Sequence, residues 1–221
     1  MEVILSLFDF IMHIDAHLTE FANSYGLWLY AILFLIIFVE TGVVVMPFLP
    51  GDSLLFAAGM LVAQPNDLNL IVLIVILLVA AILGDTLNYT IGTKIGYKAV
   101  QIKIFGKQFV KPEHLDKTHS FYEKYGSKTI VIARFVPIVR TLAPFVAGIG
   151  KMNYKTFITY NVIGGLIWVV GITLAGYFLG NIPLIKDNFS KVVLGIIFIS
   201  VLPIVIEVLK EKFLNKSIKP E

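Results

Sequence analysis

The chain has 221 residues, of which 57% are hydrophobic, 15% are charged and none is cysteine. Soluble globular chains average about 45–50% apolar and about 25% charged residues, so this composition indicates a membrane protein. The absence of cysteine excludes disulfides, thiolate zinc sites, iron–sulfur clusters and cysteine nucleophiles. The net charge of +3 does not indicate a nucleic-acid partner, because the basic residues all follow position 93 and most flank apolar runs, as in membrane-protein loops.

The N-terminal part is predicted to hold an amphipathic helix, a span and a broken segment. Residues 1–25 place polar side chains at intervals of three or four, which favours a helix at the membrane interface. The apolar run 27–46 is long enough to cross a bilayer. Three residues then break the helix: Pro47, Pro50 and Gly51. The apolar run 53–63 is too short to span, so residues 27–63 are predicted to form a span and a re-entrant segment.

The middle of the chain contains the clearest span and the main basic loop. Residues 68–91 include a long uninterrupted apolar run and are predicted to cross the membrane. Residues 92–128 carry eight lysines and a polar amphipathic helix from about Pro112 to Tyr125. By the positive-inside rule, this loop is expected on the cytoplasmic side.

The C-terminal half holds a second broken segment followed by two spans. Residues 129–150 are apolar and basic residues lie beside both ends, which predicts a second re-entrant segment that enters and leaves on the cytoplasmic side. Its helix-breaking residues are Pro137 and Pro144. Residues 157–179 and 192–209 are predicted to span the membrane, and the basic tail 210–221 is expected to be cytoplasmic.

A weak internal repeat supports this layout. A shift of 80 residues brings several identical residues onto one another, such as Gly84 and Gly164, and residues 56–59 resemble residues 145–148. Apolar segments interrupted by Pro and Gly at corresponding places are typical of transporters built from inverted repeats. We therefore expect an all-α integral membrane protein with one domain over residues 1–221. Its expected parts are transmembrane helices, two opposed re-entrant hairpins and amphipathic interfacial helices.

Four ionisable residues lie on or beside the broken segments: Glu40, Asp52, Arg134 and Arg140. A charge at bilayer depth costs about 2.5–3.5 kcal/mol on insertion scales, so these side chains are expected to pair. One interpretation is that the two acids merely neutralise the arginines, or that Asp52 caps the following helix. The other is functional, because arginine binds phosphate through bidentate hydrogen bonds and a nearby carboxylate can exchange a proton as that arginine alternates between the two anions.

Other polar residues are weaker candidates. Asp85 and Asn88 lie one turn apart near the end of a predicted span, where a simple polar helix end explains them equally well, and Thr141 is a further secondary candidate. His13 and His17 have a spacing that suits a metal, but no third ligand is close in sequence and a polar stripe explains them better. No metal and no cofactor are predicted. No nucleophile–histidine arrangement, phosphate loop or HExxH motif is seen, so no enzymatic activity is predicted.

Four motifs occupy these positions. They are Glu40-Thr-Gly, Pro47-Phe-Leu-Pro50-Gly-Asp52-Ser, Gly84-Asp85 with Asn88-Tyr89, and the run from Ala133 to Gly148. Together they resemble the DedA family of bacterial inner-membrane proteins, whose broader relatives include the eukaryotic VTT-domain lipid scramblases, and the similarity covers nearly the whole chain. The resemblance implies two opposed re-entrant hairpins and a role in moving lipid across the bilayer. It places the family's membrane acids at Glu40 and Asp52 and its essential arginines at Arg134 and Arg140.

The resemblance also implies a cargo and an energy source. For bacterial members the favoured cargo is undecaprenyl phosphate, whose return to the cytoplasmic leaflet is attributed to proton or sodium gradients. We therefore expect a flippase for a lipid phosphate, in which protonation of Glu40 or Asp52 releases an arginine to take the phosphate. Its partners would be a polyprenyl phosphate or a phospholipid, the bilayer and the coupling ion.

Two other functions stay open, namely a non-selective phospholipid scramblase and a non-transporting membrane scaffold. Self-association is also left open by the sequence. We expect a cytoplasmic N-terminus, although the first 93 residues contain no Lys or Arg from which to infer its side.

Overall fold

The described part of the protein is helical apart from one small strand pair. In a computed structural model of the chain, the residues described are 14–43, 51–95, 103–104, 107–108, 112–186, 188, 191–192 and 195. Several predicted features lie outside these residues: the start of the N-terminal helix with His13, the breaks at Pro47 and Pro50, most of the span 192–209, and the tail 210–221.

The chain divides into two compact units. The first unit comprises Met1–Gly26, Pro50–Leu68 and Thr173–Glu221. Its described elements are the start of α2 (Ile14–Gly42), α3 (Gly51–Val62), the end of α8 (Tyr154–Gly180) and α9 (Pro183–Lys186).

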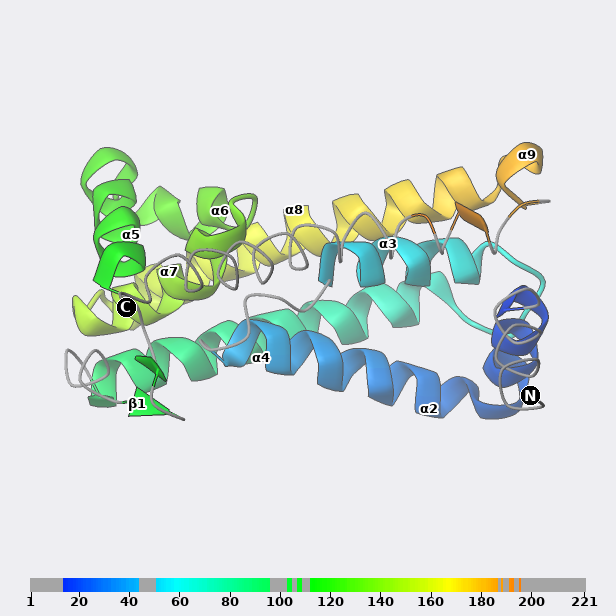
Figure 1. Ribbon diagram of the computed structural model, residues 1–221, viewed down its shortest axis with the longest axis horizontal. Coiled ribbons are helices and arrows are strands. Elements are labelled where there is room, and N and C mark those ends of the chain that lie inside the picture. The colour runs from blue at the N-terminus through cyan, green and yellow to red at the C-terminus, as the bar shows by residue number, and fades with distance from the viewer. Residues whose placement is uncertain are drawn as a thin grey trace, which may run out of the picture. The chain divides into compact units, whose positions relative to one another are not determined.

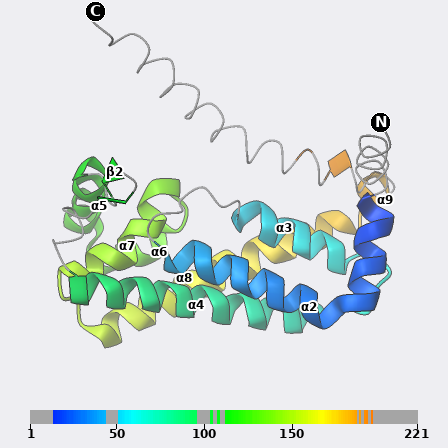
Figure 2. The same ribbon diagram turned by 60° about the horizontal axis from the view of Figure 1, so that its bottom comes forward.

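The second unit contains the candidate site and comprises Leu27–Leu49 and Asn69–Ile172. Its described elements are the rest of α2, α4 (Leu70–Ile95), β1 (Lys103–Ile104), β2 (Lys107–Gln108), α5 (Pro112–Tyr125), a 3-10 turn (Gly126–Lys128), α6 (Thr129–Ala133), α7 (Pro137–Ile149) and most of α8. Strands β1 and β2 form a minimal antiparallel pair in the basic loop. Within this unit α2 and α4 run side by side (Figures 1 and 2).

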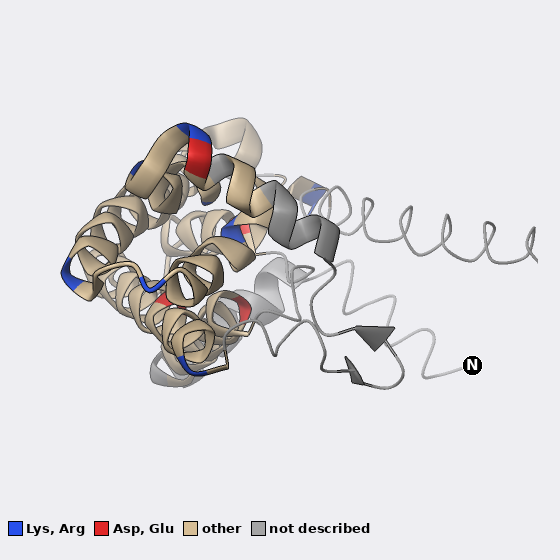
Figure 3. Cartoon of the chain, turned by 90° about the vertical axis from the view of Figure 1, so that its left-hand side faces the viewer, with Lys and Arg blue, Asp and Glu red and all other residues tan. Residues whose placement is uncertain are grey.

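Helices α4 and α8 are long and apolar enough to cross a membrane. About two thirds of the most apolar stretch of each helix is not buried within the protein. Side chains such as Ile71 and Val75 on α4 are exposed, which is typical of helices that face lipid. In Figure 3 the described helices are mostly tan, with few acidic or basic positions. The predicted spans 68–91 and 157–179 correspond to these two helices.

Helix α2 differs from its prediction. The sequence indicates an amphipathic helix to residue 25 and a separate span from residue 27, but α2 continues without interruption from Ile14 to Gly42. The two predicted segments meet at Gly26. A glycine inside a helix costs only about 1 kcal/mol and does not by itself end it, so the apolar residues on both sides keep the helix continuous.

The second broken segment consists of α6 and α7, separated by a short turn at residues 134–136. Pro137 is the first residue of α7, where its missing N–H has no helical partner to lose. Val136 before it has the extended conformation that a following proline favours, with φ of −119° and ψ of 109°. Pro144 lies inside α7 without ending it. Arg134 lies in this turn and Arg140 in the first turn of α7, and both belong to the second unit.

Glycines allow α7 to approach α4 closely. A Cβ atom on Gly92 would overlap the backbone carbonyl of Phe145, and one on Gly148 would overlap that of Tyr89. Only glycine permits this backbone approach, which is common in helix packing within membranes. The contact fixes the position of α7, and therefore of Arg140, against α4.

Candidate functional site

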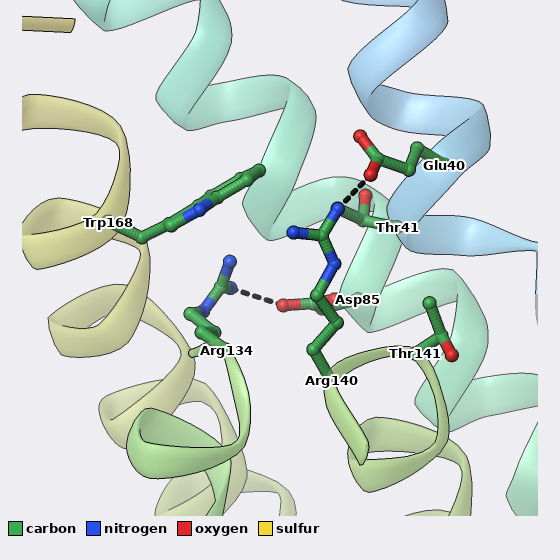
Figure 4. A pocket seen from close by; sticks show the side chains of 7 residues that line it. All are labelled: Glu40, Thr41, Asp85, Arg134, Arg140, Thr141 and Trp168. Atoms are coloured by element: carbon green, nitrogen blue, oxygen red, sulfur yellow. Dashed lines mark hydrogen bonds and ion pairs between the residues drawn. The ribbon is translucent and has the colours of Figure 1, made fainter. Parts of the chain in front are cut away.

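A small polar cavity lies inside the second unit. The seven residues that line it come from α2, α4, α7, α8 and the turn before α7: Glu40, Thr41, Asp85, Arg134, Arg140, Thr141 and Trp168 (Figure 4). The cavity measures about 10 Å³, which is about the space that one water molecule needs. Its four ionisable side chains carry a formal charge of zero when all are ionised.

One ion pair joins Arg140 to Glu40. Arg140 Nη2 donates a hydrogen bond to Glu40 Oε1, and the two side chains are 13% and 1% exposed. Glu40 lies in the last turn of α2 and Arg140 in the first turn of α7. Removing one partner of such a buried pair typically destabilises a protein by about 3–5 kcal/mol, because the other charge stays buried without compensation. The pair therefore links two helices that are distant in sequence.

The second ion pair joins Arg134 to Asp85 on α4. Arg134 Nη2 donates to Asp85 Oδ2 and also to Asn161 Oδ1 of α8, the latter at 2.6 Å. Asn161 in turn donates through Nδ2 to the carbonyl of Ile82 on α4, at 3.2 Å. Gly164 provides room for the arginine, since a Cβ atom there would lie 3.0 Å from Arg134 Nε. Arg134 is thus held between α4 and α8.

Trp168 contacts both arginines. The Cζ atom of Arg134 lies 5.6 Å and that of Arg140 lies 5.3 Å from the centre of the Trp168 ring. Both distances fall within the range of about 6 Å over which a cation is attracted to an aromatic face. The indole is buried, so this attraction acts in an environment that contains little water.

Asn88 connects the helices around the cavity. Its Nδ2 donates to the carbonyl of Thr41 at 3.2 Å and to the carbonyl of Thr141 at 2.7 Å. The side chain is fully buried on α4, one turn after Asp85. The Thr41 carbonyl is in the last turn of α2, where carbonyl groups lack intrahelical partners. Asn88 therefore ties the ends of α2 and α7 that carry Glu40 and Arg140 to the same point of α4.

Helix α5 reaches the site through Tyr122. The Tyr122 hydroxyl donates to the carbonyl of Ala143 on α7 at 2.8 Å. Burial, followed by the charge of the Asp85 carboxylate, raises the pKa of the Tyr122 phenol. The α5 helix has the bounds that the sequence predicts and contributes this side chain from the basic loop.

The structure brings together most of the predicted residues, but not all of them. Glu40, Asp85, Arg134, Arg140 and Thr141 line the cavity, and Asn88 adjoins it. Two further predicted residues, Gly51 and Asp52, begin α3. Asp52 is exposed in the first turn of α3, in the first unit, and Gly51 is buried at the start of the same helix.

Sequence analysis missed Trp168, Asn161 and Thr41. Trp168 lies in the middle of a predicted span, whereas tryptophan favours the membrane interface. Asn161 is the only side-chain amide in the predicted span 157–179. These two exceptions are signals that could have identified the residues. Among the described residues, no group of three or more His, Cys, Asp or Glu side chains could hold a metal ion.

Comparison with known proteins gives a consistent set of relatives. A family model described as the VTT domain matches residues 49–178. Protein DedA of Escherichia coli is 56% identical over 216 residues, which cover 96% of each chain. An uncharacterized membrane protein of Mycobacterium leprae is 43% identical over 171 residues, or 77% of this chain and 75% of its own. Inner membrane protein YqjA of Escherichia coli is 36% identical over 156 residues, or 70% and 69%. No solved structure matches the chain.

Proposed function

Because the chain belongs to the DedA family of VTT-domain membrane proteins, we propose that it moves a lipid phosphate across the bacterial inner membrane. The proposed cargo is undecaprenyl phosphate and the proposed driver is the proton motive force. One observation carries the proposal: a buried arginine and a largely buried one, each paired with a buried carboxylate, face one cavity in an apolar helical protein. Apolar residues could fill this volume at equal or lower free energy, so the four ionisable groups favour a functional role.

The positions of Glu40 and Arg140 on their helices favour exchange of partners. Glu40 is near the C-terminus of α2, where the helix dipole disfavours a negative charge, and Arg140 is near the N-terminus of α7, where it disfavours a positive one. The ion pair therefore offsets an unfavourable dipole interaction at each helix end. A proton on Glu40 and a phosphate on Arg140 would satisfy both helix ends, and arginine suits phosphate through bidentate hydrogen bonds.

In the proposed cycle the cavity must open to take a headgroup. Its volume suits one water molecule and not a phosphate, so Arg140 would turn away from Glu40 as the lipid arrives. Arg134 has two partners, Asp85 and Asn161, and would hold its place while it contributes charge. The polyprenyl chain would stay in the hydrocarbon region. Protonation of Glu40 would release Arg140 and so link lipid movement to protons.

Asp52 has a different proposed role from Glu40. It is exposed in the first turn of α3, where a carboxylate stabilises the helix N-terminus. We assign the exchange with Arg140 to Glu40, which is its partner, and keep Asp52 as a second proton-exchanging group on the first broken segment.

We further propose that the two broken segments are re-entrant hairpins. For the second segment, the support is that α6 and α7 are too short to span and that basic residues, Lys128 and Lys151, lie at its ends. Phe135 in the turn between the helices is 58% exposed. An exposed aromatic side chain at this turn, next to a buried arginine, suits a hairpin tip inside the hydrocarbon region.

The glycine contacts support an inverted repeat. In the first unit, a Cβ atom on Gly176 of α8 would overlap the carbonyl of Phe56 on α3, just as one on Gly92 of α4 would overlap that of Phe145 on α7. Both units thus pack a short helix on a long one through a glycine and a phenylalanine carbonyl. Gly92 and Gly176 are 84 positions apart, so these contacts align α4 with α8 at a shift of 84 residues. The sequence identities suggest a shift of 80 residues.

The remaining parts of the proposal concern location and alternatives. Residues 92–128 and the C-terminus would face the cytoplasm by the positive-inside rule, with the N-terminus on the same side. A relative named an inner membrane protein supports the inner membrane as the location. A non-selective scramblase would share the hairpins but not the headgroup preference, and a scaffold would need neither arginine.

Binding to the purified protein in nanodiscs tests the proposal. We compare radiolabelled undecaprenyl phosphate with undecaprenol, which has the same chain without the phosphate. Wild type is expected to prefer the phosphate, and Arg140→Ala to lose at least about tenfold in that preference, since a charge-assisted hydrogen bond contributes about 1.5–3 kcal/mol. Lys155→Ala, at an exposed basic residue of α8, is the control and should behave as wild type. Equal binding of both lipids by wild type would contradict headgroup recognition.

A further inference from the structure

One face of α8 is built around the two arginines. Asn161, Gly164 and Trp168 follow one another at intervals of three and four residues, so they lie on the same side of the helix. Asn161 accepts a hydrogen bond from Arg134, and Gly164 leaves room for its side chain. Trp168 contacts both guanidinium groups. Although α8 is strongly apolar, the side that carries these three residues therefore contacts the charged site.

Trp168 is the member of this face that both arginines share. The ring is 2% exposed, and in Figure 4 both guanidinium groups lie on the same side of it. Arg134 and Arg140 come from either end of the α6–α7 turn, and each has its own carboxylate. The indole is thus a common support for two otherwise separate ion pairs.

A cation–π contact, unlike an ion pair, leaves the N–H donors of an arginine available for hydrogen bonds. The attraction depends on the charge of the guanidinium and on the ring face, whereas hydrogen bonds to carboxylates or phosphates use the N–H donors. Arg140 can therefore exchange Glu40 for another anion while it keeps its contact with Trp168. During that exchange the ring would limit how far the arginine side chain moves.

We propose that Trp168 is a positioning residue for anion recognition, whose indole supports both guanidinium groups so that they can bind one phosphate together. This inference rests on the proposed function and adds a residue to it. Because both guanidinium groups pack on one ring, the ring fixes the distance between them. This arrangement also predicts a preference for a phosphate monoester, which offers three terminal oxygens and up to two negative charges to the two arginines, over the phosphodiester of a bulk phospholipid, which offers two oxygens and one charge.

Two substitutions separate the ring from the bulk of the side chain. Trp168→Phe keeps an aromatic face, and Trp168→Leu removes it while filling most of the space. We expect the phosphate-over-undecaprenol preference in nanodiscs to fall on the order of 30-fold in Trp168→Leu, because the two guanidinium groups lose the ring that positions them, and only a few-fold in Trp168→Phe. Ile167→Ala, at the exposed neighbouring residue, is the matched control and should retain the wild-type preference.

Fluorescence provides a readout that does not depend on substituting Trp168. The chain has two tryptophans, and the other, Trp28, is 66% exposed on α2, away from the site residues. In a Trp28→Phe protein, all tryptophan emission comes from Trp168. We expect undecaprenyl phosphate to change the intensity or wavelength of that emission at the concentrations at which it binds, and undecaprenol to leave it unchanged.

The outcomes separate this inference from the proposed function. If wild type binds undecaprenyl phosphate selectively but Trp168→Leu shows the same preference, Trp168 is not a positioning residue while the proposed function stands. If Trp168→Leu does not fold, the fluorescence decides, and bound undecaprenyl phosphate without any change in Trp168 emission overturns the inference. If wild type shows no preference for the phosphate, both proposals fail together.

Discussion

Glu40 and Arg140 are 100 residues apart in the sequence and form a buried ion pair between the last turn of α2 and the first turn of α7. Each charge lies at the helix end that disfavours its own sign. The pair is therefore held by mutual attraction, with Asp85 and Arg134 as the other charged groups of the same cavity. A proton that binds Glu40, or a phosphate that binds Arg140, therefore changes the electrostatic energy at both helix ends.

Neutralising Glu40 should weaken the fold and strengthen anion binding. In Glu40→Gln, Arg140 loses the ion pair that it forms with the Glu40 carboxylate, so the free energy of unfolding should fall by about 3–5 kcal/mol. The same arginine is released toward a phosphate, so affinity for undecaprenyl phosphate should rise and lose most of its dependence on pH. Thermal unfolding and equilibrium binding at several pH values measure the two effects.

The double variant Glu40→Gln with Arg140→Gln is the control for that prediction. Removing both charges leaves no uncompensated ion, so stability should return toward wild type while lipid-phosphate binding is lost. A double variant that binds and transports like wild type would instead favour the scaffold interpretation.

Gly164 should be intolerant of a single methyl group. A Cβ atom there would lie 3.0 Å from Arg134 Nε and 3.2 Å from the Cα of Val131, which is tighter than ordinary van der Waals contact. Gly164→Ala should therefore displace Arg134 from Asp85 and lower stability by about 1–3 kcal/mol. Gly171→Ala on the same helix has open space around the added atom and should be neutral or more stable by up to about 1 kcal/mol. Similar melting temperatures for the two variants would count against the packing seen at Gly164.

The sequence predicts the helices of this protein better than it predicts their partners. Helix α5 is recognisable because Pro112 begins it and a polar face follows, and α8 because its apolar run is long. Periodicity and helix-breaking residues are local signals. They show which residues form each helix, and they place Glu40, Arg134 and Arg140 on or beside the broken segments.

The pairing of these residues depends on contacts that no local pattern records. Sequence reasoning ranked Asp85 below Asp52, yet Asp85 pairs with Arg134, whose side chain has room beside Gly164 of α8. Trp168 was missed for the same reason, since its role follows from the two arginines that pack on it.

Asn88 should contribute to stability through two backbone carbonyls. Asn88→Leu removes the donors to the Thr41 and Thr141 carbonyls, and each lost hydrogen bond costs about 0.5–1.5 kcal/mol of stability. The matched control is Thr90→Val on the same helix, because the Thr90 hydroxyl donates only to the Thr86 carbonyl within its own helix. Chemical or thermal unfolding should show a clear loss for Asn88→Leu and little for Thr90→Val, and equal losses would contradict the bridging role.

Because of Tyr122, the free energy of unfolding should fall at high pH. Burial raises the pKa of its phenol, so above about pH 10 the unfolded chain loses this proton while the folded protein keeps it. The contribution of Tyr122 is fully present below about pH 10, and the free energy of unfolding falls as the pH rises beyond that value. Tyr122→Phe should be about 1 kcal/mol less stable at neutral pH, because the bond to Ala143 is lost, and should decline less steeply at high pH. Tyr125→Phe, at an exposed tyrosine of the same helix, is the control, and an unchanged alkaline slope in Tyr122→Phe would refute the assignment.

The proposed activity is the arginine-dependent movement of a lipid phosphate across the membrane. Its most direct test is translocation in sealed proteoliposomes, with undecaprenyl phosphate and a bulk phospholipid followed in parallel, with and without a proton gradient. We predict selective movement of undecaprenyl phosphate that the gradient accelerates and that Arg140→Lys impairs, because lysine keeps the charge but not the bidentate geometry. Equal movement of both lipids would identify a scramblase, and no movement of either would contradict transport altogether.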